Sequence, residues 1–127
     1  MAEQNFDVVE IKGRKKRKVC GSFAPNGSSA LVATSTKVSG GDATVSYTST
    51  GLFLISLQHR YGQLLSAVSG LQLATADNRA LQFGTYDAAA GTLELRSVDE
   101  TGTVQDIAAD ANNRVHFELT FDDALHE

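Results

Sequence analysis

The chain has 127 residues, of which 42% are hydrophobic and 20% are charged, and its formal net charge is −4. These values fit a single globular domain with one core and exclude the disordered and collagen-like classes. The single cysteine, Cys20, excludes an intramolecular disulfide. The first residues lack the basic and apolar regions of a signal peptide, and no apolar run is long enough to cross a bilayer. We therefore expect a soluble protein made in the cytoplasm.

Charge is distributed unevenly along the chain. Up to Arg60 there are eight Lys and Arg against four acids, which gives a net charge of +4. From Tyr61 onward three Arg stand against eleven acids, which gives −8 and accounts for the total of −4. This asymmetry predicts binding to an acidic surface or head-to-tail association, and it does not bear on the fold.

The first 18 residues differ in character from the rest. Residues 6–11 predict a short extended segment, because three of them are β-branched and apolar. The following run, Lys12–Lys18, holds six cations and would place charge on both faces of any strand. Because the inside of a sandwich excludes such charge, we predict an extended arm or ribbon over residues 1–18. A single β-sandwich domain is predicted over residues 19–127, where Val19 and Phe23 share one face.

The middle of the chain contains the predicted central strand. Residues 30–38 predict a strand of low amphipathicity, and residues 42–49 alternate apolar and polar side chains with a period of two. After a turn at Thr50-Gly51, the apolar run Leu52–Ile55 predicts the central strand. Since both faces of that strand are apolar, we expect both to be covered, the second by another sheet or by another protein chain.

The second half combines short strands with two predicted helical segments. Tyr61, Leu64, Leu65 and Val68 have the spacing i, i+3, i+4 and i+7 and predict one or two helical turns, and residues 105–111 predict another turn. Tight turns are predicted at residues 77–78, 87–91 and 99–102, the last with its glycine in the left-handed conformation. Paired or alternating apolar residues predict strands over residues 71–75, 81–83, 93–95 and 115–121.

The number and spacing of these elements predict the fold class. Eight or nine short strands at roughly ten-residue spacing are typical of an all-β sandwich or barrel rather than of a parallel α/β sheet. We therefore predict a jelly-roll-like antiparallel β-sandwich of about eight strands, with at most one or two short helical turns. The pattern does not fix the strand order.

The basic run is compatible with several functions. Six cations within seven residues could bind nucleic acid through phosphate contacts, and Arg14–Val19 resembles a nuclear localisation signal. No aromatic residue interleaves the run to stack on bases, and the whole chain is acidic, which argues against nucleic-acid binding. The other interpretations are a solvated arm and a basic clamp on an acidic protein surface, such as a neighbouring subunit. We favour the clamp.

Signals of metal binding and catalysis are weak. His59, His116 and His126 lack metal-ligand spacing, and Cys20 has no partner cysteine. Cys20 with a histidine could form a nucleophilic pair, but the sequence holds neither a Gly-rich phosphate loop nor a distinct pair of carboxylates. We therefore predict no metal, no cofactor and no enzymatic activity.

Several segments from residue 50 onward resemble one family. They are Thr-Gly-Leu-Phe-Leu-Ile-Ser-Leu at 50–57, Arg-Tyr-Gly-Gln-Leu-Leu-Ser at 60–66, Leu-Gln-Leu-Ala at 71–74, Gln-Phe-Gly at 82–84 and Asp-Ile-Ala-Ala-Asp-Ala-Asn-Asn-Arg-Val-His-Phe at 106–117. Over about residues 45–121 the chain resembles the capsid cement, or decoration, proteins of tailed bacteriophages, of the jelly-roll type. These motifs are strand and turn sequences rather than catalytic signatures.

The resemblance implies a structural virion protein on the exterior of the phage head. It would join neighbouring major capsid protein subunits and associate with its own copies across a two-fold axis, as a homodimer rather than a trimer. Neither a membrane nor a nucleic acid is an expected partner. Phe53 and Ile55 would pack in the core or in the dimer, and the basic run would bind the capsid. Its six cations are Lys12, Arg14, Lys15, Lys16, Arg17 and Lys18.

A second hypothesis is a host-receptor or carbohydrate-binding module of a phage fibre or spike. Sugar sites present exposed aromatic side chains over polar groups. The three tyrosines, Tyr47, Tyr61 and Tyr86, are scattered in the sequence. The hypothesis therefore depends on how the fold exposes them.

Overall fold

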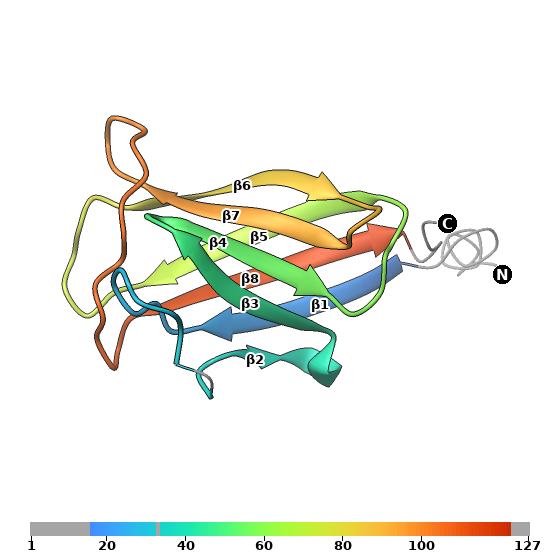
Figure 1. Ribbon diagram of the computed structural model, residues 1–127, viewed down its shortest axis with the longest axis horizontal. Helices are drawn as coiled ribbons and strands as arrows, with labels where there is room; N and C mark the ends of the chain where they lie inside the picture. Colours follow the sequence, from blue (N-terminus) through green and yellow to red (C-terminus); the bar gives the residue numbers. More distant parts are fainter. Residues whose placement is uncertain (1–15, 33, 123–127) are drawn as a thin grey trace, which may run out of the picture.

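The protein folds as a sandwich of two antiparallel sheets with four strands each (Figure 1). The computed structural model describes residues 16–32 and 34–122. Its strands are β1 (Lys16–Phe23), β2 (Lys37–Val38), β3 (Ala43–Ser49), β4 (Leu52–Leu57), β5 (Leu64–Gln72), β6 (Ala80–Asp87), β7 (Thr92–Val98) and β8 (Arg114–Asp122). One sheet has the order β2-β1-β8-β5 and the other the order β3-β4-β7-β6.

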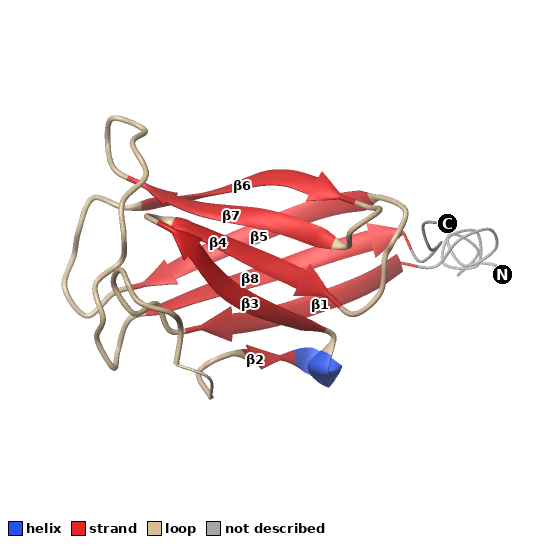
Figure 2. Ribbon diagram, in the orientation of Figure 1, coloured by secondary structure: helices blue, strands red, loops and turns tan. Residues whose placement is uncertain are grey.

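This arrangement confirms the predicted all-β antiparallel sandwich of about eight strands. The first and last strands, β1 and β8, pair over eight residues, from Lys16 opposite Asp122 to Phe23 opposite Val115. The chain crosses from one sheet to the other four times, in the connections β2–β3, β4–β5, β5–β6 and β7–β8. Within the described residues the only helical segment is one 3-10 turn at Ser39–Gly41 (Figure 2).

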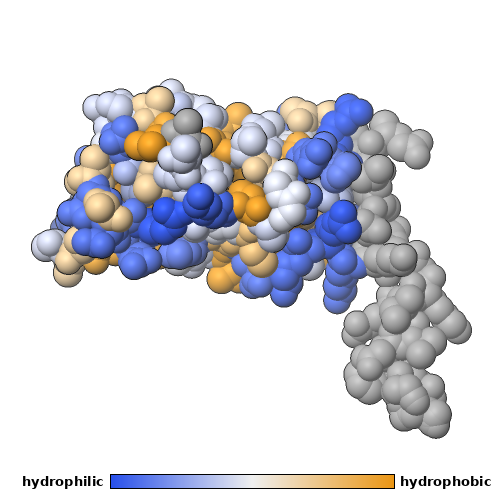
Figure 3. Space-filling model, turned by 90° about the horizontal axis from the view of Figure 1, so that it is seen from below, coloured by the Kyte–Doolittle hydropathy of each residue, from blue (hydrophilic) through white to orange (hydrophobic). Residues whose placement is uncertain are grey.

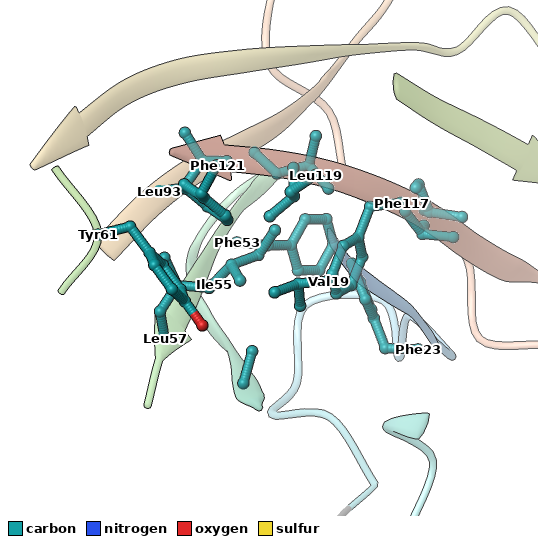
Figure 4. Close-up of a cluster of buried hydrophobic side chains, with 14 residues drawn as sticks. Val19, Phe23, Phe53, Ile55, Leu57, Tyr61, Leu93, Phe117, Leu119 and Phe121 are labelled. Atoms are coloured by element: carbon teal, nitrogen blue, oxygen red, sulfur yellow. The ribbon is translucent and has the colours of Figure 1, made fainter. Parts of the chain in front are cut away.

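The core lies between the sheets and is formed by side chains at alternate strand positions. Phe23 of β1 contacts Phe53 of β4 across the sandwich, with ring centroids 4.9 Å apart (Figure 4). Tyr61, in the β4–β5 connection, stacks on Phe121 at 4.7 Å and helps to close one end of the core. The alternation predicted for the last strand is confirmed. Its buried apolar residues are Val115, Phe117, Leu119 and Phe121, and the last residue, Asp122, departs from the alternation because it is buried as well.

β4 is an inner strand of its sheet, as predicted, but only one of its faces is dry. Phe53 and Ile55 point into the core and are 1% and 0% exposed. On the outer face Leu54 is only partly buried and lies opposite Glu94 of β7. Glu94 Oε1 is 3.3 Å from Arg96 Nη2, so a charged pair flanks the outer face of the strand. Within the described residues no third layer covers this outer face. Its covering by another protein chain stays a prediction.

The helix predicted from Tyr61 to Val68 is wrong, because β5 begins at Leu64. The pairing of β5 with β8 shifts register between Leu64 and Ser66, so Leu65 is an extra residue in the strand. This bulge lets Leu64 and Ala67, three residues apart, both pack against the core. A bulged strand thus imitates the i, i+3 spacing of a helix. The strand predicted over residues 71–75 is the end of β5, which stops at Gln72.

The strand predicted over residues 30–38 is also wrong for most of its length. Among the described residues of this range only Lys37–Val38 form a strand, which pairs with Gly21 and Ser22 of β1. The Ser35 N–H donates to the Val32 carbonyl at 2.9 Å, which closes a turn where the strand was expected.

The helical turn predicted at residues 105–111 is a loop. The Gln105 N–H donates to the Ser97 carbonyl at 2.9 Å, and the Ile107 carbonyl accepts from the Gly27 N–H at 3.0 Å. In a helix the Ile107 carbonyl would instead accept from the N–H of residue 111, whereas the Gln105 N–H, in the first turn, would have no partner within the helix. Pairing with other segments therefore replaces the helix.

The predicted hairpin turns are confirmed. Gly51 and Gly102 have φ values of 66° and 83°, in the left-handed region. The loop between β6 and β7 is closed by the Gly91 N–H, which donates to the Asp87 carbonyl at 2.7 Å.

Candidate functional site

The basic end of the sandwich, which we define as Lys16, Arg17 and Lys18, is the start of β1. All three side chains are exposed. The strand accepts them because Lys16 and Lys18 point away from the core. Arg17 is on the same face as the buried Val19, two positions later, but it lies near the end of the sheet and stays exposed. β1 thus includes three residues of the predicted arm. The other predicted capsid-binding cations, Lys12, Arg14 and Lys15, lie outside the described residues.

Glu118 of β8 links the basic end to Cys20. Its Oε2 atom is 3.3 Å from Lys18 Nζ and accepts a hydrogen bond from Cys20 Sγ at 3.6 Å. Burial, together with the hydrogen bond to Glu118, raises the pKa of the Cys20 thiol. A nucleophilic cysteine needs the opposite, a lowered pKa that favours the thiolate. His116, on the same face, hydrogen-bonds Gln72 at 3.1 Å and not Cys20.

The opposite end of the sandwich is acidic. Figure 1 shows the β5–β6 and β7–β8 connections at the end away from the start of β1. These loops also contain Arg79. Its Nη1 is 3.7 Å from Asp77 Oδ1, and its Nε donates to the Asp106 carbonyl at 3.2 Å. Acids lie at the other end too, since Asp122 is opposite Lys16 and Glu118 pairs with Lys18, but these loops contain more of them. The acids of this acidic end are Asp77, Asp99, Glu100, Asp106 and Asp110.

Two of these acids have structural roles. Asp106 Oδ1 accepts from the Tyr47 hydroxyl and from the Gly51 N–H, both at 2.8 Å, and so ties the β7–β8 loop to the β3–β4 turn. Asp99 Oδ1 accepts from the Thr101 hydroxyl at 2.7 Å and from the Thr103 N–H at 3.1 Å. Hydrogen bonds from the Thr101 hydroxyl and then from the Thr103 N–H lower the pKa of Asp99.

The lowered pKa of Asp99 predicts a pH-dependent contribution to stability. A carboxylate with a folded pKa below its unfolded value of about 3.9 stabilises the fold fully above that value. The contribution disappears as the pH falls through the folded pKa. Asp99→Ala should therefore have a lower Tm than the wild type at neutral pH, and the difference should shrink below about pH 4. Asp99→Asn is the control for shape, and a difference that stayed constant in acid would contradict this role.

A small hollow lies between the β5–β6 connection and residues 107–113. Its volume is about 190 Å³, below the roughly 300 Å³ at which ligand pockets begin. Asn113, on its wall, is 7% exposed and accepts from the Ala74 N–H at 2.8 Å while its amide donates to the Ala108 carbonyl at 2.9 Å. We interpret Asn113 as a link between two loops rather than as a ligand-binding group.

The other predicted site residues occupy structural positions. Phe53 and Ile55 are in the core, so they serve packing and do not face a partner. Tyr61 is 2% exposed, and the hydroxyls of Tyr47 and Tyr86 bond within the sandwich, so the tyrosines do not form an exposed platform for sugars. No group of three or more His, Cys, Asp or Glu in the described part of the chain could hold a metal ion.

The exposed apolar side chains of β5 were not predicted from the sequence. Leu65 and Val68 are 44% and 59% exposed, although the predicted helix placed them on a buried face. A signal was present in the sequence, since residues 64–72 contain neither charge nor proline and so read equally well as a strand.

Comparison with known proteins gives no assignment. No protein-family model matches the chain, and neither a curated protein nor a solved structure does. Among the described residues no helix is long and apolar enough to span a membrane. Function must therefore be argued from the surface of the sandwich.

Proposed function

We propose that this protein is a capsid cement, or decoration, protein of a tailed bacteriophage. In this role it binds the outer surface of the head and joins neighbouring major capsid protein subunits without performing chemistry. The observation that carries the proposal is the exposed basic end, held on a rigid sandwich whose opposite end is acidic. The resemblance of residues 45–121 to cement proteins supplies the class of partner.

The geometry of the basic end suits attachment to an acidic protein surface. Its residues are paired with β8 from Lys16 opposite Asp122 onward, so the backbone that carries the cations is already ordered. Binding then loses less conformational entropy than it would with a disordered arm. Exposed charges also accelerate encounter with an oppositely charged surface, and this effect weakens with salt.

Neutralising the basic end should weaken binding to capsid shells. Each exposed ion pair contributes about 0.2–1 kcal/mol, so Lys16→Gln combined with Lys18→Gln should weaken binding roughly two- to thirty-fold. Co-sedimentation with purified shells that lack DNA measures this effect, and the difference from the wild type should shrink as salt is added. Lys37→Gln, which removes an exposed cation from β2 of the same sheet, is the matched control.

Two outcomes would count against the proposal. Equal binding of the double variant and the wild type would show that the basic end does not contribute to binding the shell. Strong binding to DNA, with an affinity that falls steeply with salt, would favour a nucleic-acid partner instead.

A further inference from the structure

The outer edge of β5 is an exposed apolar strand edge. β5 is the last strand of its sheet and has β8 as its strand partner. Its nine residues, Leu-Leu-Ser-Ala-Val-Ser-Gly-Leu-Gln, contain no charge and no proline. Val68 and Leu65 are two of the three exposed large hydrophobic residues of the described chain. An uncharged edge of this length is a template for pairing with another strand.

The other edges differ from β5 in ways that discourage pairing. β2 has only two residues, one of which is Lys37. β3 exposes hydroxyl side chains, Thr44, Ser46 and Thr48, on its outer face. Figure 3 views the side of the sandwich that carries β2 and β3, where hydrophilic residues dominate and hydrophobic ones form small separate spots. β6 contains a register shift against β7 between Phe83 and Tyr86. Short strands, polar residues and bulges are the usual protections of an edge.

Gly70 leaves open space on the outer face of β5, which a side chain of a paired strand could cover. Glycine weakens a strand and is favoured there by a bulge or by close approach of another backbone. A Cβ atom on Gly70 would meet nothing within 4 Å, so the described monomer gives no steric reason for glycine. Nor is its φ in the left-handed region, unlike that of Gly51 or Gly102. Its neighbour on β8 is His116, and no register shift occurs there.

We propose that β5 pairs antiparallel with β5 of a second copy of this chain, around a two-fold axis at Ser69. In this register Val68 of each copy lies opposite Gly70 of the other and fills the open space above it. Ala67 lies opposite Leu71 on the core side, so a small residue again meets a larger one. The strand is uncharged, so no like charges are brought together. The two sheets join into one continuous sheet of eight strands with isologous contacts.

This inference does not depend on capsid binding, because the isolated chain should already be a dimer. Sedimentation equilibrium of the full chain tests it. Val68→Lys should weaken the dimer at least about tenfold, since it places two like charges close together on paired strands next to the two-fold axis. The same change should leave the fold of the monomer intact, because Val68 is 59% exposed. A purely structural role for Val68 would instead lower the Tm without changing the association.

The matched control is Ser46→Lys, which adds a cation in the same way at an exposed position of the edge strand β3. It should leave the dimer unchanged. A wild-type chain that is monomeric at every concentration would overturn the proposal. So would a dimer that Ser46→Lys weakens and Val68→Lys does not.

Disulfide formation tests the register itself. In a Cys20→Ser background, Ser69→Cys places two cysteines directly opposite each other across the axis, at a spacing that a disulfide can bridge. Val68→Cys places them on a diagonal, and it should cross-link much less. Efficient cross-linking at position 68 with none at 69 would reject the proposed register.

Discussion

Phe53→Ala is expected to lower the free energy of unfolding by about 3–5 kcal/mol, a large part of the 5–15 kcal/mol typical of a domain. Phe53 is 1% exposed, and the centroid of its ring lies 4.9 Å from that of Phe23 and 5.9 Å from that of Tyr47. Figure 4 shows it between the two sheets, where both walls are held by strand pairing and cannot close on the gap. Denaturant unfolding followed by circular dichroism measures the effect, and Tm should fall by roughly 10–20 °C.

Leu54→Ala is the matched control for Phe53→Ala. Leu54 is the next residue of β4 but faces outward and is only partly buried. Truncation of Leu54 should lower the free energy of unfolding by about 1 kcal/mol, because it removes less buried apolar surface than truncation of Phe53 does. If both substitutions cost the same, the outer face of β4 would have to be as dry as the inner one, which contradicts the sandwich as described.

Gly51→Ala is expected to lower the free energy of unfolding by about 2–5 kcal/mol. Its φ of 66° costs a residue with a Cβ about 1–2 kcal/mol. Overpacking adds about 1–3 kcal/mol, because the new Cβ would lie 2.7 Å from the Gln105 nitrogen and from the Ser97 carbonyl oxygen. Both are backbone atoms that cannot rotate away. Gly51 also accepts from the Ser97 N–H at 2.7 Å, so displacement of the turn would disturb β7.

Gly27→Ala separates the two contributions to the effect at Gly51. Gly27 has a φ of 61°, close to that of Gly51, but a Cβ there would meet nothing within 4 Å. The Gly27 variant should therefore lose only the roughly 1–2 kcal/mol of backbone strain. Equal losses in chemical denaturation for both variants would mean that the close approach of β7 to Gly51 has no energetic effect.

Strands with one buried face could be predicted well from the sequence. On β8, polar residues such as His116 and Glu118 alternate with buried ones such as Phe117 and Leu119, and this period of two has no helical alternative. The turn at Gly51 was predicted for a similar reason, since few residues other than glycine adopt a positive φ.

The errors arose where long-range contacts override local pattern. The bulge at Leu65 gives β5 a helix-like spacing, and only its pairing with β8 decides between the two structures. In residues 105–111 the Ile107 carbonyl, which a helix would use, instead accepts from the N–H of Gly27, distant in sequence. Neither contact can be read from a local window.

For the candidate site, the exposed cations could be predicted from the sequence, whereas the exposed edge strand could not. A sandwich cannot bury so many cations, so their exposure could be predicted. The exposed side chains of Lys16 and Lys18 confirm this prediction. Phe53 and Ile55 were predicted for the core or for the dimer, and their burial decides for the core. The exposed edge at Val68 was not predicted, because the spacing of residues 61–68 indicated a helix.

A cryo-EM map of the intact phage head tests the proposed function most directly. We expect β-sandwich density on the outer surface at neighbouring capsid subunits, with the start of β1 and Lys16 directed at the shell. Heads in which this chain is absent, or located inside the shell or on the tail, would contradict the proposal.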